Sequence, residues 1–359
     1  MSSKVSATEI IQSRKNNKRL KQEKLLEKLE KKRKLEEETP LDSSTTAHEE
    51  DSLGRDYTIS VAVAGSILDN AQSPELRTYL GGQIARGLAV FKVDEVIVFE
   101  DRPKTENQSA EGDKLRASPL QLARILQFLE CPQYLRKHFF PLHKDLQYSG
   151  VLNPSDMPHH FRSNEFDCIY REGIILDRPV KEGAGSLAFI GFKEDCIVDK
   201  KVPPGIRVTV QLEGKRSING LWKGKAVSPH IPRTKSGLYW GYNVRVVNSL
   251  FSVFQNCPYK EGYDVRIGTS ERGTSVDNYN LPKKFKHLLI VIGGLKGLEF
   301  AFESESDKAE ATEVEDLFDC YLNTCPNQGS RTIRTEEALL ITLSALRPKI
   351  LESWSPKDM

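Results

Sequence analysis

The feature that most constrains the fold of this chain is an alternation of strand-like and helix-like segments, which is typical of a parallel α/β sheet. Residues 58–68 (TISVAVAGSIL) and 94–101 (DEVIVFED) are apolar runs rich in Val and Ile. Between them, Ser73-Pro74 supplies a capping residue and a proline for the first turn, so we expect a helix from there to about residue 92. A second Ser-Pro pair opens residues 118–140, for which we expect another capped amphipathic helix.

Residues 165–235 interrupt this alternation. Short runs of Val, Ile and Phe are broken there by Gly and Pro, and no stretch has the period of a helix. This pattern predicts an all-β module, most simply a five-stranded barrel of OB type. The strand and helix pattern then returns. We therefore expect one α/β domain, formed by residues 57–164 and 236–359, into which an OB-like β-barrel of residues 165–235 is inserted.

The first 56 residues have a different composition. Residues 14–34 are rich in Lys, and residues 36–52 are acidic and rich in Ser and Thr. We expect a charged helical arm followed by a disordered linker. The run Lys31-Lys32-Arg33-Lys34 suits either a nuclear import signal or a phosphate-binding arm, and a solvated helix face is the equally simple alternative.

Composition excludes several other classes of protein. The 359 residues carry a formal net charge of only +2, so global charge points to no partner. The six cysteines include no CxxC pair, and we expect no metal site. The adjacent His159 and His160 are expected to make loop or phosphate contacts. Neither a signal peptide nor an apolar run of membrane-spanning length is visible, so we expect an intracellular protein without a membrane partner.

Three loops near the carboxyl end share one kind of sequence. Residues 268–273 (GTSERG), 293–297 (GGLKG) and 327–330 (NQGS) each follow a strand-like run and are small or polar. In parallel α/β sheets ligands bind at the carboxyl ends of strands, and glycine lets a ligand approach the backbone closely. The three loops together predict a site that holds a nucleoside-like group by its main chain. Neither a P-loop nor a GxGxxG motif is present.

Several long segments resemble one family in the same order. They are residues 58–101, 141–162 (PLHKDLQYSGVLNPSDMPHHFR), 237–250 (GLYWGYNVRVVNSL), 267–273 (IGTSERG), 291–299 (VIGGLKGLE) and 327–346 (NQGSRTIRTEEALLITLSAL). The chain thereby resembles the SPOUT-class RNA methyltransferases, in the eukaryotic and archaeal branch with an OB-like insert. The resemblance covers residues 57–350 and leaves the charged tail outside.

The resemblance implies a C-terminal trefoil knot that binds S-adenosyl-L-methionine (SAM). It also implies a homodimer and methylation of RNA, with ribosomal RNA (rRNA) and N3 of uridine as the expected target. The cofactor-binding candidates are Gly268, Thr269, Ser270, Gly273, Ile292, Gly293, Gly294, Gly297, Gln328, Gly329, Ser330, Ile333, Arg334 and Glu337.

Two residues are candidates for a catalytic role. Arg86 interrupts a small and apolar stretch of the first helix, which in the family contributes to the substrate site across the dimer. A structural ion pair, for instance with Glu271, is the alternative. Asn327 could orient the base, or simply cap the backbone of its loop. Arg334 and Glu337, three residues apart, could form an ordinary helix pair or close the pocket.

Basic residues interleaved with Phe189, Phe192 and Trp222 suit single-stranded RNA, through phosphate attraction and base stacking. An ordinary barrel surface is the alternative. The RNA-binding candidates are Arg77, Lys200, Lys201, Arg207, Lys215, Arg216 and Lys223.

Two other functions compete with RNA methylation. One is a non-catalytic RNA-binding, ribosome-assembly or mitotic spindle and kinetochore scaffold that keeps the knot fold, and the other is a protein methyltransferase. The nucleus or nucleolus is the expected location, with the cytoplasm and spindle as alternatives.

Overall fold

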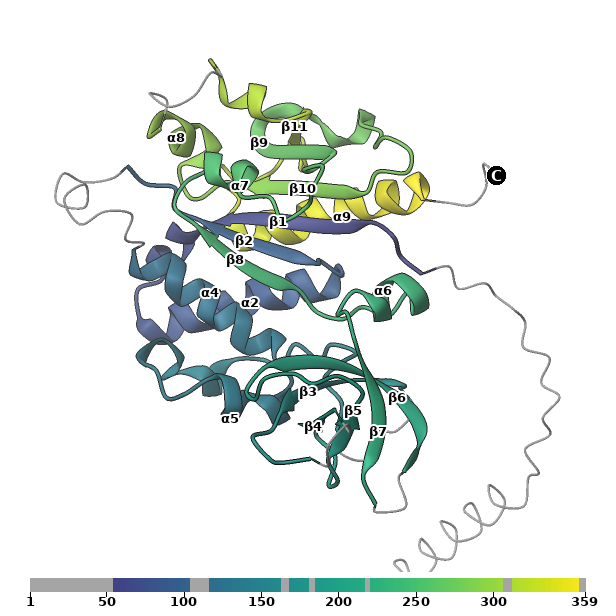
Figure 1. Cartoon of the computed structure of the whole chain (residues 1–359). Helices are drawn as coiled ribbons and strands as arrows, with labels where there is room; N and C mark the ends of the chain where they lie inside the picture. The colour runs from purple at the N-terminus through teal and green to yellow at the C-terminus, as the bar shows by residue number, and fades with distance from the viewer. Residues whose placement is uncertain are drawn as a thin grey trace, which may run out of the picture. The chain divides into compact units, whose positions relative to one another are not determined.

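The computed structural model of the protein describes residues 54–103, 116–162, 168–180, 185–216, 220–305 and 312–354 (Figure 1). The predicted charged arm and linker, including the basic run at 31–34, lie outside the described residues. The side chains of Lys215 and Arg216 also lie outside them. No helix among the described residues is long and apolar enough to cross a membrane.

A six-stranded parallel sheet forms the centre of the α/β domain, as the alternating pattern predicted. The strands β1 (Thr58–Ala64) and β2 (Glu95–Phe99) are buried along their whole length, which explains their continuous runs of Val, Ile and Ala. The strand order is β11 (Cys320–Asn323), β9 (Val265–Ser275), β10 (His287–Ile292), β1 (Thr58–Ala64), β2 (Glu95–Phe99) and β8 (Asn243–Val247).

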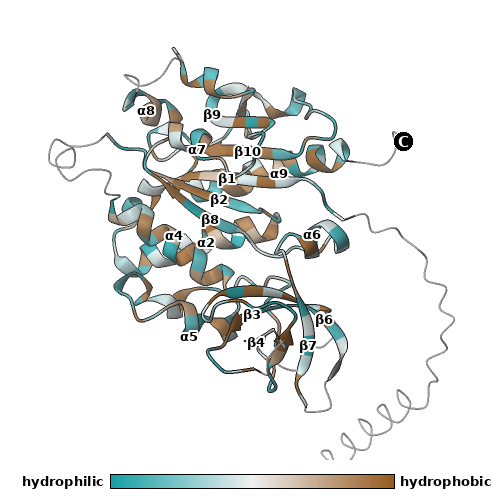
Figure 2. Cartoon of the chain, viewed as in Figure 1, coloured by the Kyte–Doolittle hydropathy of each residue, from teal (hydrophilic) through white to brown (hydrophobic). Residues whose placement is uncertain are grey.

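Helices cover both faces of this sheet (Figures 1 and 2). Side chains alternate along β1, so that Val61 and Val63 enter one core and Ala62 and Ala64 enter the other. The first core is completed by α2 (Pro74–Val90), α4 (Ala117–Glu130) and α9 (Thr335–Ser353), and the second by α7 (Phe251–Gln255) and α8 (Gly297–Glu303). Short 3-10 turns occur at Gly65–Asn70, Gln133–Leu135, Lys144–Leu146, Ser149–Val151, Val276–Asn278 and Val314–Leu317.

One predicted helix start is confirmed and the other is wrong. The Ser73 side chain accepts a hydrogen bond from the Leu76 backbone N–H at 3.3 Å and caps α2. Ser118, in contrast, lies inside α4, and its hydroxyl donates to the Asp69 carboxylate at 2.6 Å. The predicted helix over 118–140 also ends early, since α4 stops before Pro132, where a 3-10 turn leads into α5 (Arg136–Phe139).

The predicted barrel is present. Five strands close on one another in the order β3-β4-β5-β7-β6, within the range 165–235. A short helix, α6 (Ile231–Ser236), leads from the barrel back to the sheet. The barrel strands are β3 (Tyr170–Ile175), β4 (Ser186–Phe189), β5 (Cys196–Val198), β6 (Arg207–Arg216) and β7 (Trp222–Val227).

A buried ionic cluster joins the barrel to the end of α4. The Arg207 guanidinium on β6 donates to both oxygens of Glu130, at 2.6 and 2.9 Å, and to Glu172 on β3 at 2.6 Å. Trp240 Nε1 donates to Glu172 at 2.6 Å. Burial acts to raise the pKa of Glu130, but Arg207 and His159 outweigh it and hold that pKa well below its ordinary value. The cluster therefore fixes the barrel against the α/β domain by charged hydrogen bonds.

Candidate active site

The three small-residue loops meet at the carboxyl edge of the sheet. Residues 268–273, predicted as a loop after a strand, lie within β9 instead. The pairing of β9 with β11 jumps from Gly268–Tyr321 to Thr274–Leu322, so residues 269–273 form a bulge beside β11. The loops after β10 and β11 lie beside this bulge, and together they line a cavity of about 320 Å³. The sequence prediction that these loops share one site agrees with this geometry.

Eight of the fourteen predicted cofactor residues line the cavity, and six do not. Gly268 instead packs beneath aromatic rings, because a Cβ there would lie 2.6 Å from both Phe318 and Tyr321. Gly273 is similarly pressed against the backbone of Leu322, at 2.6 Å from a Cβ. The lining residues are Thr269, Ser270, Ile292, Gly293, Gly294, Gly297, Gln328 and Ile333; those outside are Gly268, Gly273, Gly329, Ser330, Arg334 and Glu337.

Glycine is required where the loop after β10 turns. A Cβ on Gly293 would lie 2.7 Å from the Gly297 carbonyl carbon, and one on Gly294 would lie 2.6 Å from Asp101 Oδ2. A side chain at either position would therefore clash, at Gly293 with the loop's own backbone and at Gly294 with Asp101, which follows β2. The main chain of the loop thus faces the cavity with no side chain at these two positions.

The first turns of α9 form a wall of the cavity that the sequence analysis missed. Thr335 donates its hydroxyl hydrogen to the Gly293 carbonyl at 3.1 Å, which ties α9 to the loop after β10. Thr342 is fully buried and shares a hydrogen bond of 2.9 Å with Thr324. The missed α9 residues are Thr335, Ala338, Ile341 and Thr342, whose helical spacing was the available signal.

Two more missed lining residues are Glu299, on α8, and Arg331, in the loop after β11. Glu299 of α8 accepts a hydrogen bond from the Ser270 hydroxyl at 2.9 Å, which links the bulge of β9 to α8. Arg331 also lines the cavity and is exposed. The cavity thus combines an aliphatic wall with main-chain groups, hydroxyls, a carboxylate and a guanidinium, which is a mixture suited to a nucleoside.

Arg334 and Glu337 lie at the start of α9 and cap it. The Glu337 carboxylate accepts a hydrogen bond from the Arg334 backbone N–H at 2.9 Å. Glu337 faces a different cavity, of about 390 Å³, which it lines together with Arg86. The first turn of α9 therefore separates the cavity of the three loops from the cavity that contains Arg86.

The two catalytic candidates lie apart from the cavity of the three loops in this chain. Arg86 donates to the carbonyls of Ser155 at 2.8 Å and Pro154 at 3.3 Å. The alternative of an ion pair between Arg86 and Glu271 does not match these contacts. Asn327 is exposed, with a left-handed φ of 58°. Neither residue lines the three-loop cavity.

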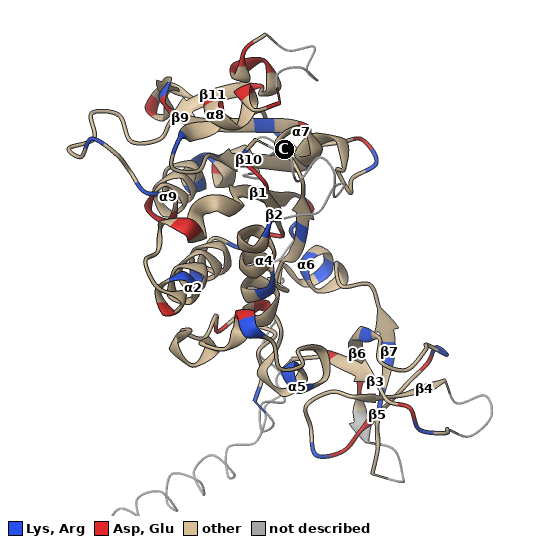
Figure 3. Ribbon diagram, turned by 90° about the vertical axis from the view of Figure 1, so that its left-hand side faces the viewer, with Lys and Arg blue, Asp and Glu red and all other residues tan. Residues whose placement is uncertain are grey.

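The predicted RNA-binding residues differ in their surroundings. Lys200, Lys201 and Lys223 are exposed on the barrel, and Figure 3 shows basic residues on β6, β7 and α6. Arg77 is half-buried on α2. Arg207 requires a correction, because its guanidinium is engaged by Glu130 and Glu172 in the junction cluster. Its structural role leaves it poorly placed to bind RNA.

The two adjacent histidines have structural contacts. His159 Nε2 and His160 Nε2 lie 3.0 and 2.7 Å from the Glu130 carbonyl oxygen. Burial lowers the pKa of His160 to about 3, and the neighbouring His159 contributes. Among the described residues, no group of three or more His, Cys, Asp or Glu is arranged to hold a metal ion.

Comparison with known proteins decides the family. A family model described as "Putative RNA methyltransferase" matches residues 58–346. The chain belongs to this RNA methyltransferase family. The SPOUT-class resemblance found in the sequence is thereby confirmed. The match favours an RNA methyltransferase over the scaffold and the protein methyltransferase.

Animal relatives of this RNA methyltransferase are similar over most of its length. A human "28S rRNA (uridine-N(3))-methyltransferase" is 52% identical over 319 residues, which cover 87% of this chain and 84% of the human protein. A mouse protein of the same name is 53% identical, with 84% of this chain and 79% of the mouse protein covered. A Drosophila melanogaster protein of that name is 52% identical, with 82% of this chain and 62% of the Drosophila protein covered.

Proposed function

We propose that the protein transfers the methyl group of SAM to N3 of a uridine in large-subunit rRNA. The observation that supports this proposal is the cavity formed by the bulge of β9, the loops after β10 and β11, and the first turns of α9. The name of the human relative, which specifies 28S rRNA and uridine N3, supports the choice of substrate.

The residues of the cavity fit an adenosine-containing cofactor. Ile292, Ile333 and Ile341 offer aliphatic contacts for an adenine ring, and the bare backbone at Gly293 and Gly294 offers N–H and C=O groups for its edge. The Glu299 carboxylate, held by Ser270, offers an acceptor for ribose hydroxyls. When bound, SAM supplies a methyl group on a positively charged sulfur.

The reaction asks the protein chiefly for positioning. With SAM bound, methyl transfer would form the N3–carbon bond as the sulfur–carbon bond breaks, with the electron pair left on sulfur and the N3 proton released to water. A cation beside the uracil favours loss of that proton because it stabilises the developing negative charge. Arg331, exposed at the cavity, lies where it could do so, and Arg86 is the candidate from a second copy of the chain.

A homodimer is part of the proposal. Leu76, Tyr79 and Val90 on α2 and Leu340 on α9 are apolar side chains that are 43–59% exposed, and three of these four residues line or adjoin the cavity of Arg86. We expect a second copy to cover this face, which would bring Arg86 to the partner's substrate site. Tyr79→Glu should then give monomers by light scattering, whereas Leu142→Glu, an equally apolar and fully exposed position outside this face, should leave dimers.

Three finer assignments belong to the same proposal. The barrel order β3-β4-β5-β7-β6, with β5 and β7 as its parallel pair, supports an OB-type barrel. The passage of residues 324–334 from β11 to α9, past the bulge of β9 and the loop after β10, supports a trefoil knot. A nucleolar location agrees with an rRNA substrate.

The test is methyl transfer from labelled SAM to 28S rRNA, followed by nucleoside mass spectrometry. The proposal expects 3-methyluridine at one position, and loss of transfer in Gly294→Trp. Methylation of ribose or of another base would contradict the N3 assignment. SAM binding without transfer to any rRNA would favour the scaffold alternative.

A further inference from the structure

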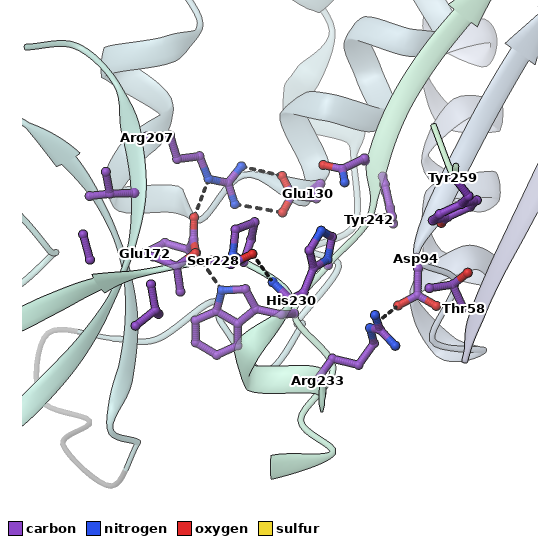
Figure 4. Close-up of a pocket in the computed structure, with 18 of the residues that line it drawn as sticks. Thr58, Asp94, Glu130, Glu172, Arg207, Ser228, His230, Arg233, Tyr242 and Tyr259 are labelled. Atoms are coloured by element: carbon purple, nitrogen blue, oxygen red, sulfur yellow. Dashed lines mark hydrogen bonds and ion pairs between the residues drawn. The ribbon is translucent and has the colours of Figure 1, made fainter. Parts of the chain in front are cut away.

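Another cavity, of about 450 Å³, lies between the barrel and the amino-terminal edge of the sheet (Figure 4). Thr58 and Asn243, the first residues of β1 and β8, line it from the sheet side, and Thr209 lines it from the barrel. Because the sheet is parallel, this edge is opposite the carboxyl edge that holds the proposed SAM site. The seven residues of β1 span about 20 Å, so a ligand here is too far from that site in the same chain to be the methylated base.

The carboxylates of this cavity are neutralised. Figure 4 shows each of them turned toward an arginine. Glu130 and Glu172 share one arginine and Asp94 has two, so three guanidinium groups balance the three carboxylates around the cavity. The pairs are Asp94 with Arg55 at 2.6 Å and with Arg233 at 3.6 Å, and Glu130 and Glu172 with Arg207, each at 2.6 Å.

Three exposed polar side chains of the cavity are available to a ligand. Lys200, His230 and Asn243 line it, and within the described part of the chain their side chains have no hydrogen-bond or ion-pair partner. A lysine and a histidine suit a phosphate. An asparagine carboxamide carries both donors and an acceptor, which is what the edge of a nucleobase requires.

The cavity is also held in shape before any ligand enters. The Arg207 cluster fixes the barrel strands to α4, and Arg233 on α6 donates to the backbone carbonyls of Arg55 and Tyr57 at 2.6 and 2.7 Å. Its barrel, helix and sheet walls are therefore tied together. A preformed site binds with a smaller loss of conformational entropy than one that must be assembled.

We propose that this cavity binds one nucleotide of the RNA substrate, several positions away from the methylated base. Lys200 and His230 contact the phosphate, and Asn243 contacts the edge of the base. The inference rests on the proposed function for the identity of the ligand as RNA. It adds a second contact point, at the opposite edge of the sheet, that sets which stretch of RNA is held while the target base is at the SAM site.

The test is fluorescence anisotropy of a short labelled oligouridylate with the full-length protein and four variants. Lys200→Ala and Asn243→Ala alter the cavity. Lys193→Ala and Asn280→Ala remove the same groups from exposed positions that do not line it. Each cavity variant should weaken binding about five-fold or more, and each control less than two-fold. An oligomer of abasic nucleotides should abolish the effect of Asn243→Ala and preserve that of Lys200→Ala.

Equal losses in Lys200→Ala and Lys193→Ala, or unchanged binding in Asn243→Ala, would overturn the proposal. Equal losses would indicate general attraction to a basic surface. Titration of each variant with S-adenosylhomocysteine (SAH) checks folding separately. Wild-type protein that binds RNA but not SAH would count against the proposed function, while the RNA titrations would still decide this site.

Discussion

Replacing Glu130 by glutamine tests the junction cluster, because it removes one charge and nearly preserves shape. The Glu130 carboxylate accepts two hydrogen bonds from Arg207, at 2.6 and 2.9 Å, and its side chain is only 9% exposed. A glutamine would turn an amide N–H₂ toward the guanidinium donors. Removing one partner of a buried ion pair costs about 3–5 kcal/mol. Arg207 keeps Glu172 at 2.6 Å, so we expect the lower end, about 3 kcal/mol.

The assay is urea and thermal unfolding of the full-length protein at neutral pH. A loss of about 3 kcal/mol corresponds to a fall in Tm of about 6–12 °C for a domain of this size. Glu213→Gln is the matched control, since its pair with Lys225 is 3.7 Å long and exposed, and it should cost less than about 1 kcal/mol. Arg207→Met should lower the free energy of unfolding more than Glu130→Gln does, because it leaves both Glu130 and Glu172 without their arginine. A Glu130→Gln protein within 1 kcal/mol of wild type would refute the reasoning.

Three further predictions follow from individual contacts. Thr335→Val loses the hydrogen bond to Gly293 and should weaken SAH binding about five-fold in calorimetry, about 1 kcal/mol; unchanged affinity would remove α9 from the site. Burial raises the pKa of the Cys131 thiol to about 12, so iodoacetamide at pH 8 should not label it. Cys325 lines the cavity; mass spectrometry should find it labelled in the free protein and protected when SAH is present. His160 has a lowered pKa of about 3 against an ordinary 6.5. Between pH 3 and pH 6.5 this histidine therefore carries a proton in the unfolded chain but not in the folded one, so the free energy of unfolding should fall as pH drops through this range. The same dependence of unfolding free energy on pH in His160→Gln would contradict this.

The carboxyl edge of the sheet was predictable from sequence because its logic is local. Apolar runs predict the strands, and stretches of small residues mark where they end. In a parallel sheet the carboxyl ends of all strands lie at the same edge. Thr269, Gly293 and Gln328 could thus be placed in one cavity without any knowledge of contacts. The α9 wall was missed because helical spacing shows which residues share a face, while tertiary packing decides what that face meets.

The partners of charged residues were the least predictable feature. Arg207 looked like a surface cation in a basic strand, but its partner Glu130 is 77 residues away in sequence. Ser118 looked like a helix cap, but its hydroxyl donates a hydrogen bond to Asp69, 49 residues earlier in the sequence. Residue type and local spacing carry no information on such pairs, because they depend on how the barrel and the 3-10 turns dock against α4.

Calorimetric titration of the full-length protein with SAH is the most direct measurement of the central claim. The account predicts one site per chain with micromolar affinity. This affinity should be lost in Gly294→Trp, where a Cβ already meets Asp101 at 2.6 Å, and kept in Gly150→Trp, where a Cβ meets nothing within 4 Å. Absence of binding by the folded wild-type protein, or binding that survives in Gly294→Trp, would contradict a cofactor site formed by the three loops.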